Sequence, residues 1–106
     1  MKQVLAYKTA NGKCPYEDWF YTLDKTIRAR VEKRIERVRN GNYGDFKKLD
    51  NDLFELRFTC GSGYRIYFTE ANNIFIILLS AGNKGTQAED IKKAKIYLTD
   101  LIERNR

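Results

Sequence analysis

The sequence predicts an α+β fold with a small, mostly antiparallel sheet, a helix pair on one sheet face and a C-terminal helix. Three observations carry this prediction. Two segments with alternating apolar residues flank a glycine-rich turn at residues 61–63, which is typical of a β-hairpin. Two stretches with helical spacing precede the hairpin, and a third one ends the chain. The expected order is β-α-α-β-β-β-α, within one domain that spans residues 1–106.

The N-terminal part is expected to supply one strand and the helix pair. Residues 3–8 (QVLAYK) predict the first strand, and Pro15 suits the first turn of a helix that runs to residue 23. Asp24 is expected to cap a second helix, and Gly41 is expected to end it. The apolar stripe of that helix is Ile27, Val31, Ile35 and Val38. Its arginines and lysines are expected to form a solvated face, and the polar residues 40–52 predict a loop.

Alternation fixes which side chains of the hairpin share a face. The apolar face carries Leu56, Phe58, Ile66 and Phe68, and the helix pair should cover it. A three-residue loop at 61–63 would place Arg57 opposite Tyr67 and keep the apolar side chains of both strands together. Arg57, Arg65 and Tyr67 would then leave the other face together, with Glu55 at its edge.

The segment after the hairpin predicts a buried strand followed by a capped helix. Residues 74–79 (IFIILL) are uniformly apolar, which is typical of a strand covered on both faces. Thr86 and Glu89 fit a capping box at the start of a helix over residues 87–103. A helix N-terminus favours a nearby phosphate, and Lys84 adds a full positive charge there. By position alone, an ordinary strand-to-helix connection explains the same pattern.

Composition narrows the possible chemistry. Twenty basic residues against fourteen acidic ones give a net charge of +6, which indicates an anionic partner such as nucleic acid. Histidine is absent, so acid–base chemistry would have to use Lys, Arg, Tyr, Asp or Glu. Cys14 and Cys60 match no metal spacing and are expected to be free thiols in a reducing cytoplasm. We expect no metal and no cofactor. We also expect no membrane partner, because no apolar run is long enough to span a bilayer.

Four short segments resemble the RelE/ParE superfamily of bacterial toxins. They are Gly44-Asp45-Phe46-Lys47, Glu55-Leu56-Arg57, Gly61-Ser62-Gly63-Tyr64-Arg65 and Gly82-Asn83-Lys84-Gly85-Thr86-Gln87. The resemblance is closest to the HigB-like, phage-associated branch of addiction-module killer proteins, and it covers residues 19–101. It implies a toxin of a type II toxin–antitoxin system that cuts mRNA on the translating ribosome. It also implies a cognate antitoxin, which is expected to bind DNA, as the neutralising partner.

The resemblance also implies a candidate site on the predicted basic face. RNA is cut without metal when its own 2′-hydroxyl attacks the adjacent phosphate, and arginine can neutralise the phosphorane that forms. Arg65 matches the arginine of the family's Gly-Tyr-Arg turn, and Lys84 matches the basic residue of the loop before the last helix. The candidate catalytic residues are Arg65, Lys84, Arg57 and Asp90. The candidate RNA-binding residues are Lys47, Lys48, Tyr67, Tyr64 and Gln87.

Several assignments stay open on the sequence alone. The general base is Lys84, Asp90 or a group of the substrate or ribosome, because relatives carry either tyrosine or aspartate at the position of Asp90. Tyr64 has the parity of the apolar face, so core packing explains it as well as base stacking. Arg57 and Arg65 also fit a structural cross-strand ladder. Two other functions stay open too, a ParE-like inhibitor of DNA gyrase and a non-catalytic module that binds RNA or protein.

Overall fold

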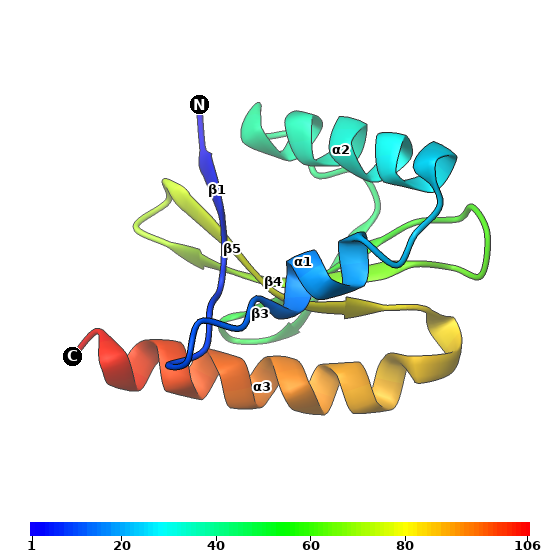
Figure 1. Cartoon of the computed structure of the whole chain (residues 1–106). Coiled ribbons are helices and arrows are strands. Elements are labelled where there is room, and N and C mark those ends of the chain that lie inside the picture. The colour runs from blue at the N-terminus through cyan, green and yellow to red at the C-terminus, as the bar shows by residue number, and fades with distance from the viewer.

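The computed structural model describes all residues, 1–106, and shows one sheet with helices on both faces (Figure 1). The elements are β1 (Gln3–Ala6), α1 (Pro15–Phe20), α2 (Lys25–Arg39), β2 (Phe46–Asp50), β3 (Leu53–Arg57), β4 (Arg65–Ala71), β5 (Phe75–Gly82), a 3₁₀ turn η1 (Lys84–Thr86) and α3 (Gln87–Arg104). The predicted α+β class is confirmed. Strand β2 is a correction, because it lies in residues 40–52, where the sequence predicts a loop.

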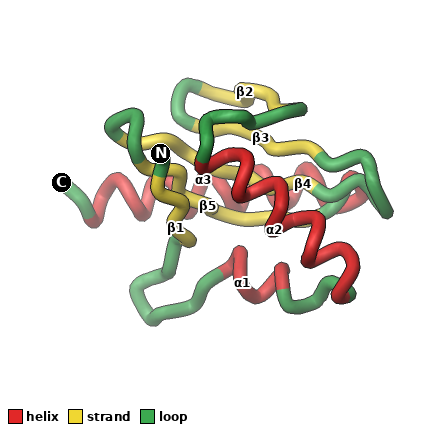
Figure 2. Tube along the Cα trace, turned by 90° about the horizontal axis from the view of Figure 1, so that it is seen from above, coloured by secondary structure: helices red, strands yellow, loops and turns green.

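The five strands lie in the order β1-β5-β4-β3-β2 (Figure 2). Strand β1 is parallel to β5, and the other three pairs are antiparallel, so the sheet is mostly antiparallel as predicted. Strand β5 has a strand on each side. Its Ile76 packs in the core under the helix pair and its Leu79 packs in the core under α3. The predicted strand covered on both faces is therefore confirmed.

The hairpin register differs from the prediction by two residues. Arg57 lies opposite Arg65 and Glu55 lies opposite Tyr67, whereas the sequence predicts Arg57 opposite Tyr67. The reason is that β3 ends at Arg57, so the connection runs over residues 58–64 and closes with a 2.9 Å hydrogen bond from Phe58 N to Tyr64 O. A shift of two residues keeps every side chain on its own face, so the predicted faces are correct.

The first sheet face is apolar and lies under the helix pair. Its buried cluster contains Phe20, Val31, Ile35, Val38, Leu56, Phe58, Ile66, Phe68, Ile76 and Leu78. Pro15 is the first residue of α1, and the Asp24 side chain caps α2 by accepting a 3.0 Å hydrogen bond from Ile27 N. These local signals place the apolar stripe of α2 over the hairpin, as the sequence predicts.

The second sheet face lies under α3 and mixes apolar with polar side chains. Its apolar cluster is Tyr7, Leu53, Tyr67, Leu79 and Ala94. Glu55, Thr69, Ser80 and Asp90 are buried as well. The candidate site therefore has to be sought on this face, where it reaches the end of α3. No helix in the chain has both the length and the apolar character that a membrane span requires.

The N-terminus of α3 is built differently from the prediction. Thr86 occupies the N-cap position, but its side chain makes no capping hydrogen bond. Instead, Asn83 Oδ1 accepts hydrogen bonds from Gly85 N (2.8 Å) and Thr86 N (3.1 Å), and Asn83 N donates to Thr86 Oγ1 (3.1 Å). The capping box predicted for Thr86 and Glu89 is wrong, because the chain makes a 3₁₀ turn before the α-helix and the box closes on that turn.

Candidate functional site

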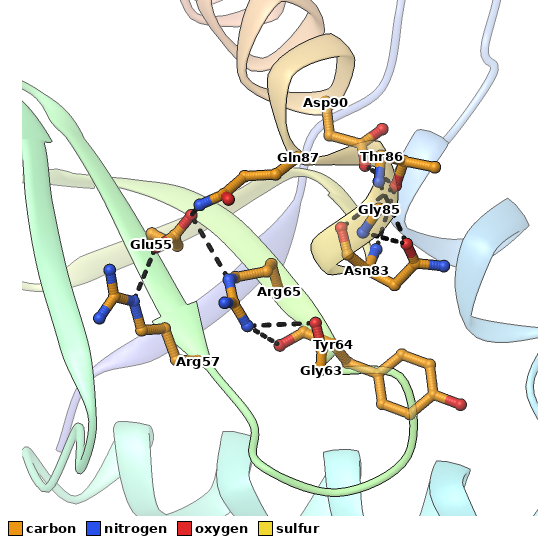
Figure 3. Close-up of polar contacts among 10 residues, drawn as sticks. All are labelled: Glu55, Arg57, Gly63, Tyr64, Arg65, Asn83, Gly85, Thr86, Gln87 and Asp90. Carbon is orange, nitrogen blue, oxygen red and sulfur yellow. Dashed lines mark hydrogen bonds and ion pairs between the residues drawn. The ribbon is translucent and has the colours of Figure 1, made fainter.

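Glu55 is a fully buried carboxylate at the centre of a polar cluster on the second sheet face (Figure 3). Its Oε1 accepts a 2.9 Å hydrogen bond from Arg57 Nε, two residues along β3. Its Oε2 accepts a 2.7 Å hydrogen bond from Gln87 Nε2 at the start of α3, and it lies 3.8 Å from Arg65 Nε on β4. One carboxylate thus joins three elements and holds two arginines side by side.

The electrostatic balance of this cluster keeps Glu55 ionised. Burial raises the pKa of the Glu55 carboxyl, but the hydrogen bonds to it, first of all from Arg57 and Gln87, and the charge of Arg57 together outweigh burial, so the pKa lies below its ordinary value of 4.5. With one carboxylate against two guanidinium groups, the cluster carries one net positive charge at neutral pH. The carboxylate positions the arginines without neutralising both of them.

Arg65 is nearly buried and only partly satisfied. Its side chain is 13% exposed, and its Nη1 donates to Gly63 O at 3.1 Å in the hairpin loop. Its Nε is buried without a hydrogen-bond acceptor, and Nη2 has no protein acceptor either. A buried donor without a partner typically costs about 1–3 kcal/mol. Such groups in native structures call for an explanation, and an anionic ligand that engages the guanidinium would be one.

Arg57 presents its guanidinium fork to solvent. Its side chain is 34% exposed, its Nε is bound to Glu55, and its two terminal nitrogens donate to no protein group. The hydrogen bond to Glu55 raises the pKa of Arg57, so this side chain stays charged. On the neighbouring strand β2, Lys47 lies opposite Glu55, which places it on the same sheet face, and it is exposed. Lys48 lies opposite Phe54 and therefore points to the other face.

Lys84 reaches this region because two loops meet. Its backbone N–H donates to Ser62 O at 3.4 Å, which ties the 3₁₀ turn to the hairpin loop. Gly63, at φ +75°, lies between them: a Cβ added there would be 3.4 Å from Lys84 Cβ and 3.6 Å from Arg65 Nη1. The side chain of Lys84 is exposed. An exposed lysine therefore stands next to the loop that holds Arg65.

Three of the predicted RNA-binding side chains have structural neighbours of their own. Tyr67 is 0% exposed, and its hydroxyl is buried without a partner, so its ring offers no surface on which a base could stack. Tyr64 is half-buried and lies edge-on to Trp19 with 6.2 Å between ring centroids. The amide of Gln87 is bound to Glu55. Tyr67 is thus a residue of the apolar cluster under α3, and Gln87 supports the arginine cluster from α3.

Asp90 lies apart from the arginines, in the contact between β5 and the start of α3. It is 8% exposed, and its carboxylate accepts a hydrogen bond from the Thr86 hydroxyl (Figure 3). Its backbone oxygen accepts a 3.0 Å hydrogen bond from Ser80 Oγ. A Cβ on Gly82 would fall 1.8 Å from Asp90 Oδ2, so only glycine leaves room for this carboxylate. The structure does not bring Asp90 into the Glu55 cluster.

Two residues that support the site are not among the predicted site residues. Glu55 is one: the sequence places it at the edge of the basic face, whereas it lies fully buried at the centre of the cluster. Arg34 of α2 is the other. Its guanidinium donates to the backbone oxygens of Tyr43 (3.0 Å), Asp45 (2.7 Å) and Arg57 (2.7 Å). Arg34 thereby fixes the segment that leads into β2 against the end of β3, and nothing in a basic helix shows which arginine turns inward.

The chain is a small α+β protein whose five-stranded sheet carries a buried polar cluster with two arginines under its C-terminal helix. A structure of a mutant of the E. coli toxin RelE in the free state is similar, with a TM-score of 0.56 and 16% identity over 84% of this chain and 98% of that chain. At this identity the likeness is one of fold. The chain belongs to the family "Phage derived protein Gp49-like (DUF891)", whose model matches residues 18–102. An uncharacterized protein of Haemophilus influenzae is 41% identical over 88 residues, which are 81% of this chain and 88% of the relative.

Proposed function

We propose that this protein is the toxin of a type II toxin–antitoxin system, of the HigB-like, phage-associated branch, and a ribosome-dependent mRNA endoribonuclease. The Gp49-like family and the RelE-type fold support the toxin assignment. One observation supports the nuclease assignment most strongly. A buried glutamate holds Arg57 and Arg65 side by side, and each guanidinium keeps terminal N–H groups that no protein acceptor uses.

The cluster suits cleavage in which the RNA supplies its own nucleophile. The 2′-oxygen would bond to the adjacent phosphorus while the bond from phosphorus to the 5′-oxygen breaks. Arg65 and Arg57 would bind the non-bridging oxygens, where the negative charge of the phosphorane develops. Lys84 would give a proton to the leaving 5′-oxygen, because it is the exposed amine beside the Arg65 loop. The 2′-hydroxyl proton would pass to a group of the substrate or the ribosome, because Asp90 lies in packing away from the arginines.

The partners that follow from this proposal are mRNA on the ribosome and a cognate antitoxin that binds DNA. We expect the antitoxin to cover the basic surface with an acidic or amphipathic segment. Because long-range attraction speeds association between opposite charges, the association rate should fall as salt rises. Stopped-flow mixing of the two proteins over a range of salt concentrations measures this. A rate that is independent of salt would contradict an acidic segment.

A second function is favoured by the burial of three of the groups that could transfer a proton. Tyr67 and Asp90 are buried, and Glu55 is fully buried between its arginines, so Lys84 is the one candidate left to donate a proton. The same basic surface could therefore bind RNA without cutting it. The two functions differ in a single measurement, the cleavage of bound mRNA.

The test is single-turnover cleavage of mRNA on programmed ribosomes at saturating protein, where only the chemical step remains. We expect the wild type to cleave and Arg65→Ala to cleave about 10²–10³-fold more slowly, as is typical when one such electrostatic contact is removed. Arg65→Lys should restore little, because an ammonium group cannot present two parallel N–H donors. If Arg65→Ala cleaves at the wild-type rate, the proposed site is wrong. A wild type that binds without cleaving supports the second function, and growth arrest with inhibited gyrase supercoiling supports a ParE-like inhibitor.

A further inference from the structure

Helix α2 carries both of its acidic residues on one side. Glu32 and Glu36 line the groove toward α1 and β1, where Arg39 pairs with Glu36. On another side, basic side chains three, four and seven positions apart share one helix face and line a separate hollow of about 280 Å³. These side chains are Arg30, Lys33, Arg34 and Arg37. The other wall of the hollow is the start of the β3–β4 loop, residues 58–60. The solvated face that the sequence predicts is thus a basic concave surface.

Three of the four charges that line this hollow have no ion-pair partner within the protein, and the fourth, Arg34, is under the charge of Asp45. No carboxylate lines it, and none of Arg30, Lys33 and Arg37 takes part in an ion pair or a side-chain hydrogen bond. Like charges one helical turn apart repel each other, so this arrangement lowers the stability of α2. An external anion would supply the missing counter-charge, and an extended anion would engage several of the side chains at once.

The hollow also adjoins the arginine cluster. Arg34 contributes its charge to the hollow, and it donates a 2.7 Å hydrogen bond to the backbone oxygen of Arg57. The loop residues that wall the hollow follow directly on Arg57 along the chain. The side chain of Arg57 points to the other sheet face, so the two basic surfaces lie on either side of one strand end. A polyanion that reaches around this end contacts both of them.

We propose that this hollow is a second nucleic-acid surface, which binds the phosphate backbone of an RNA outside the segment that is cut. The choice of RNA rests on the function proposed above. The surface binds by charge and without reading bases, because the one aromatic ring in it, Phe58, is 7% exposed and is covered by the Arg34 guanidinium at 4.9 Å. Binding to phosphate alone gives affinity and salt dependence but no sequence preference.

The experiment compares two triple variants that remove the same charge from different places. The test variant is Arg30→Gln/Lys33→Gln/Arg37→Gln, and the matched control is Lys8→Gln/Lys92→Gln/Lys95→Gln, whose side chains are all exposed and line neither basic surface. Each variant lowers the net charge from +6 to +3. Glutamine keeps helix propensity close to that of the residues it replaces. If the triple variant failed to fold by circular dichroism, the single variant Arg37→Gln would replace it, with Lys95→Gln as its control.

The probe is a 2′-O-methyl RNA oligonucleotide, which binds but cannot be cut because it has no 2′-hydroxyl. We expect the slope of log K against log salt to become shallower by about 0.7 for each phosphate that the variant no longer neutralises, up to about 2 for the test variant. The control should change clearly less. Equal changes in both variants, or no binding of the probe by the wild type, would overturn the proposal. So would a test variant that binds RNA normally but binds the antitoxin weakly, since the hollow would then be a protein-binding surface.

This experiment separates the hollow from the cutting site. With a cleavable mRNA at saturating protein, the test variant should cleave at the wild-type rate, because saturation removes the contribution of binding. If the wild type never cleaves but the test variant still loses RNA affinity, RNA binding in the hollow is supported and the nuclease proposal is wrong. If the wild type cleaves and the two triple variants bind RNA alike, the nuclease proposal is supported and RNA binding in the hollow is wrong.

Discussion

The two faces of the β3–β4 hairpin are built from the same alternating strands, but they are buried in different ways. Under the helix pair, Leu56, Ile66 and Phe68 are at most 1% exposed and lie in an apolar cluster. Under α3, Glu55 and Tyr67 are equally buried, yet one is an ionised carboxylate and the other has an unpaired hydroxyl. Burial alone therefore does not distinguish the faces. The difference lies in whether burial leaves polar groups unsatisfied.

This difference indicates that the two faces have different roles, one in stability and the other in positioning the arginines. Apolar burial contributes stability in proportion to the area removed from water. A buried ion pair contributes little net stability, because desolvation offsets the attraction between its charges. The Nε of Arg65 lies 3.8 Å from Glu55 Oε2 but has no hydrogen-bond acceptor, which costs stability. We infer that the first face holds the fold together and that the second face holds the arginines in place.

Phe68→Ala should destabilise the protein the most. The side chain is 1% exposed in the apolar cluster, and truncating such a phenylalanine typically costs about 3–5 kcal/mol of unfolding free energy. Urea unfolding measures it, with Ile96→Ala as control, since Ile96 is 65% exposed and should change stability by less than about 0.5 kcal/mol. The folded fraction of Phe68→Ala should cleave normally. A specific loss of cleavage per folded molecule would show that the first face also serves the site.

Glu55→Gln should lower both stability and cleavage. Removing one partner of a buried ion pair costs about 3–5 kcal/mol, and here the cost should be nearer about 2 kcal/mol because Arg57 is 34% exposed. The matched control is Leu53→Ala, a buried side chain two residues away on the same strand and face. It should cost about as much stability while the folded protein still cleaves. Measured at saturation, Glu55→Gln should slow the chemical step, because Arg57 and Arg65 lose the group that orients them. Equal cleavage by both variants would mean that Glu55 contributes to stability but does not position the arginines for cleavage.

Glu55 should also shape the dependence of stability on pH. Its pKa in the folded protein lies below the ordinary value of 4.5, so it contributes stability at neutral pH, and this contribution is lost as the pH falls below about 4.5. Glu55→Gln removes the titrating group, so the difference in unfolding free energy between wild type and variant should shrink as the solution becomes more acidic. Urea unfolding at several pH values between neutrality and acid measures this difference. A difference that is constant over this range would contradict a lowered pKa.

Alternation predicted the faces of the hairpin but not its contacts. Side-chain parity depends only on the strand period, so Arg57 and Arg65 share a face in either register. The length of the loop depends on the positive φ of Gly61 and Gly63, and two glycines admit more than one loop. Strand β2 escaped prediction because it is an edge strand with mostly exposed side chains, and Arg34 ties the segment before it to β3. That attachment depends on tertiary contacts that no local pattern reveals.

For the candidate site, the sequence predicted which side chains share a face but not how they contact one another. The family resemblance named Arg65, Arg57 and Lys84, and the structure brings these three to one end of the second face. The sequence did not show that α3 covers this face, and that cover is why Tyr67 is buried and Gln87 is bound to Glu55. A side chain of a helix contacts a strand far away in the sequence only after the chain has folded. Local residue spacing therefore cannot predict such a contact.

The smallest expected effect separates two adjacent lysines of β2. Lys47 lies opposite Glu55 on the second face, whereas Lys48 lies opposite Phe54 on the first face, and both are exposed. Lys47→Ala should weaken binding to programmed ribosomes and make its salt slope shallower by about 0.7, with little change in the chemical step at saturation. Lys48→Ala removes the same charge one residue away and lines neither basic surface, so it should leave the slope nearly unchanged. Because net charge, strand and exposure are shared, a difference can come only from the face that each lysine occupies. Equal slopes would mean that the RNA does not distinguish the two faces of β2. The different roles of the two sheet faces would then not extend to this edge of the sheet.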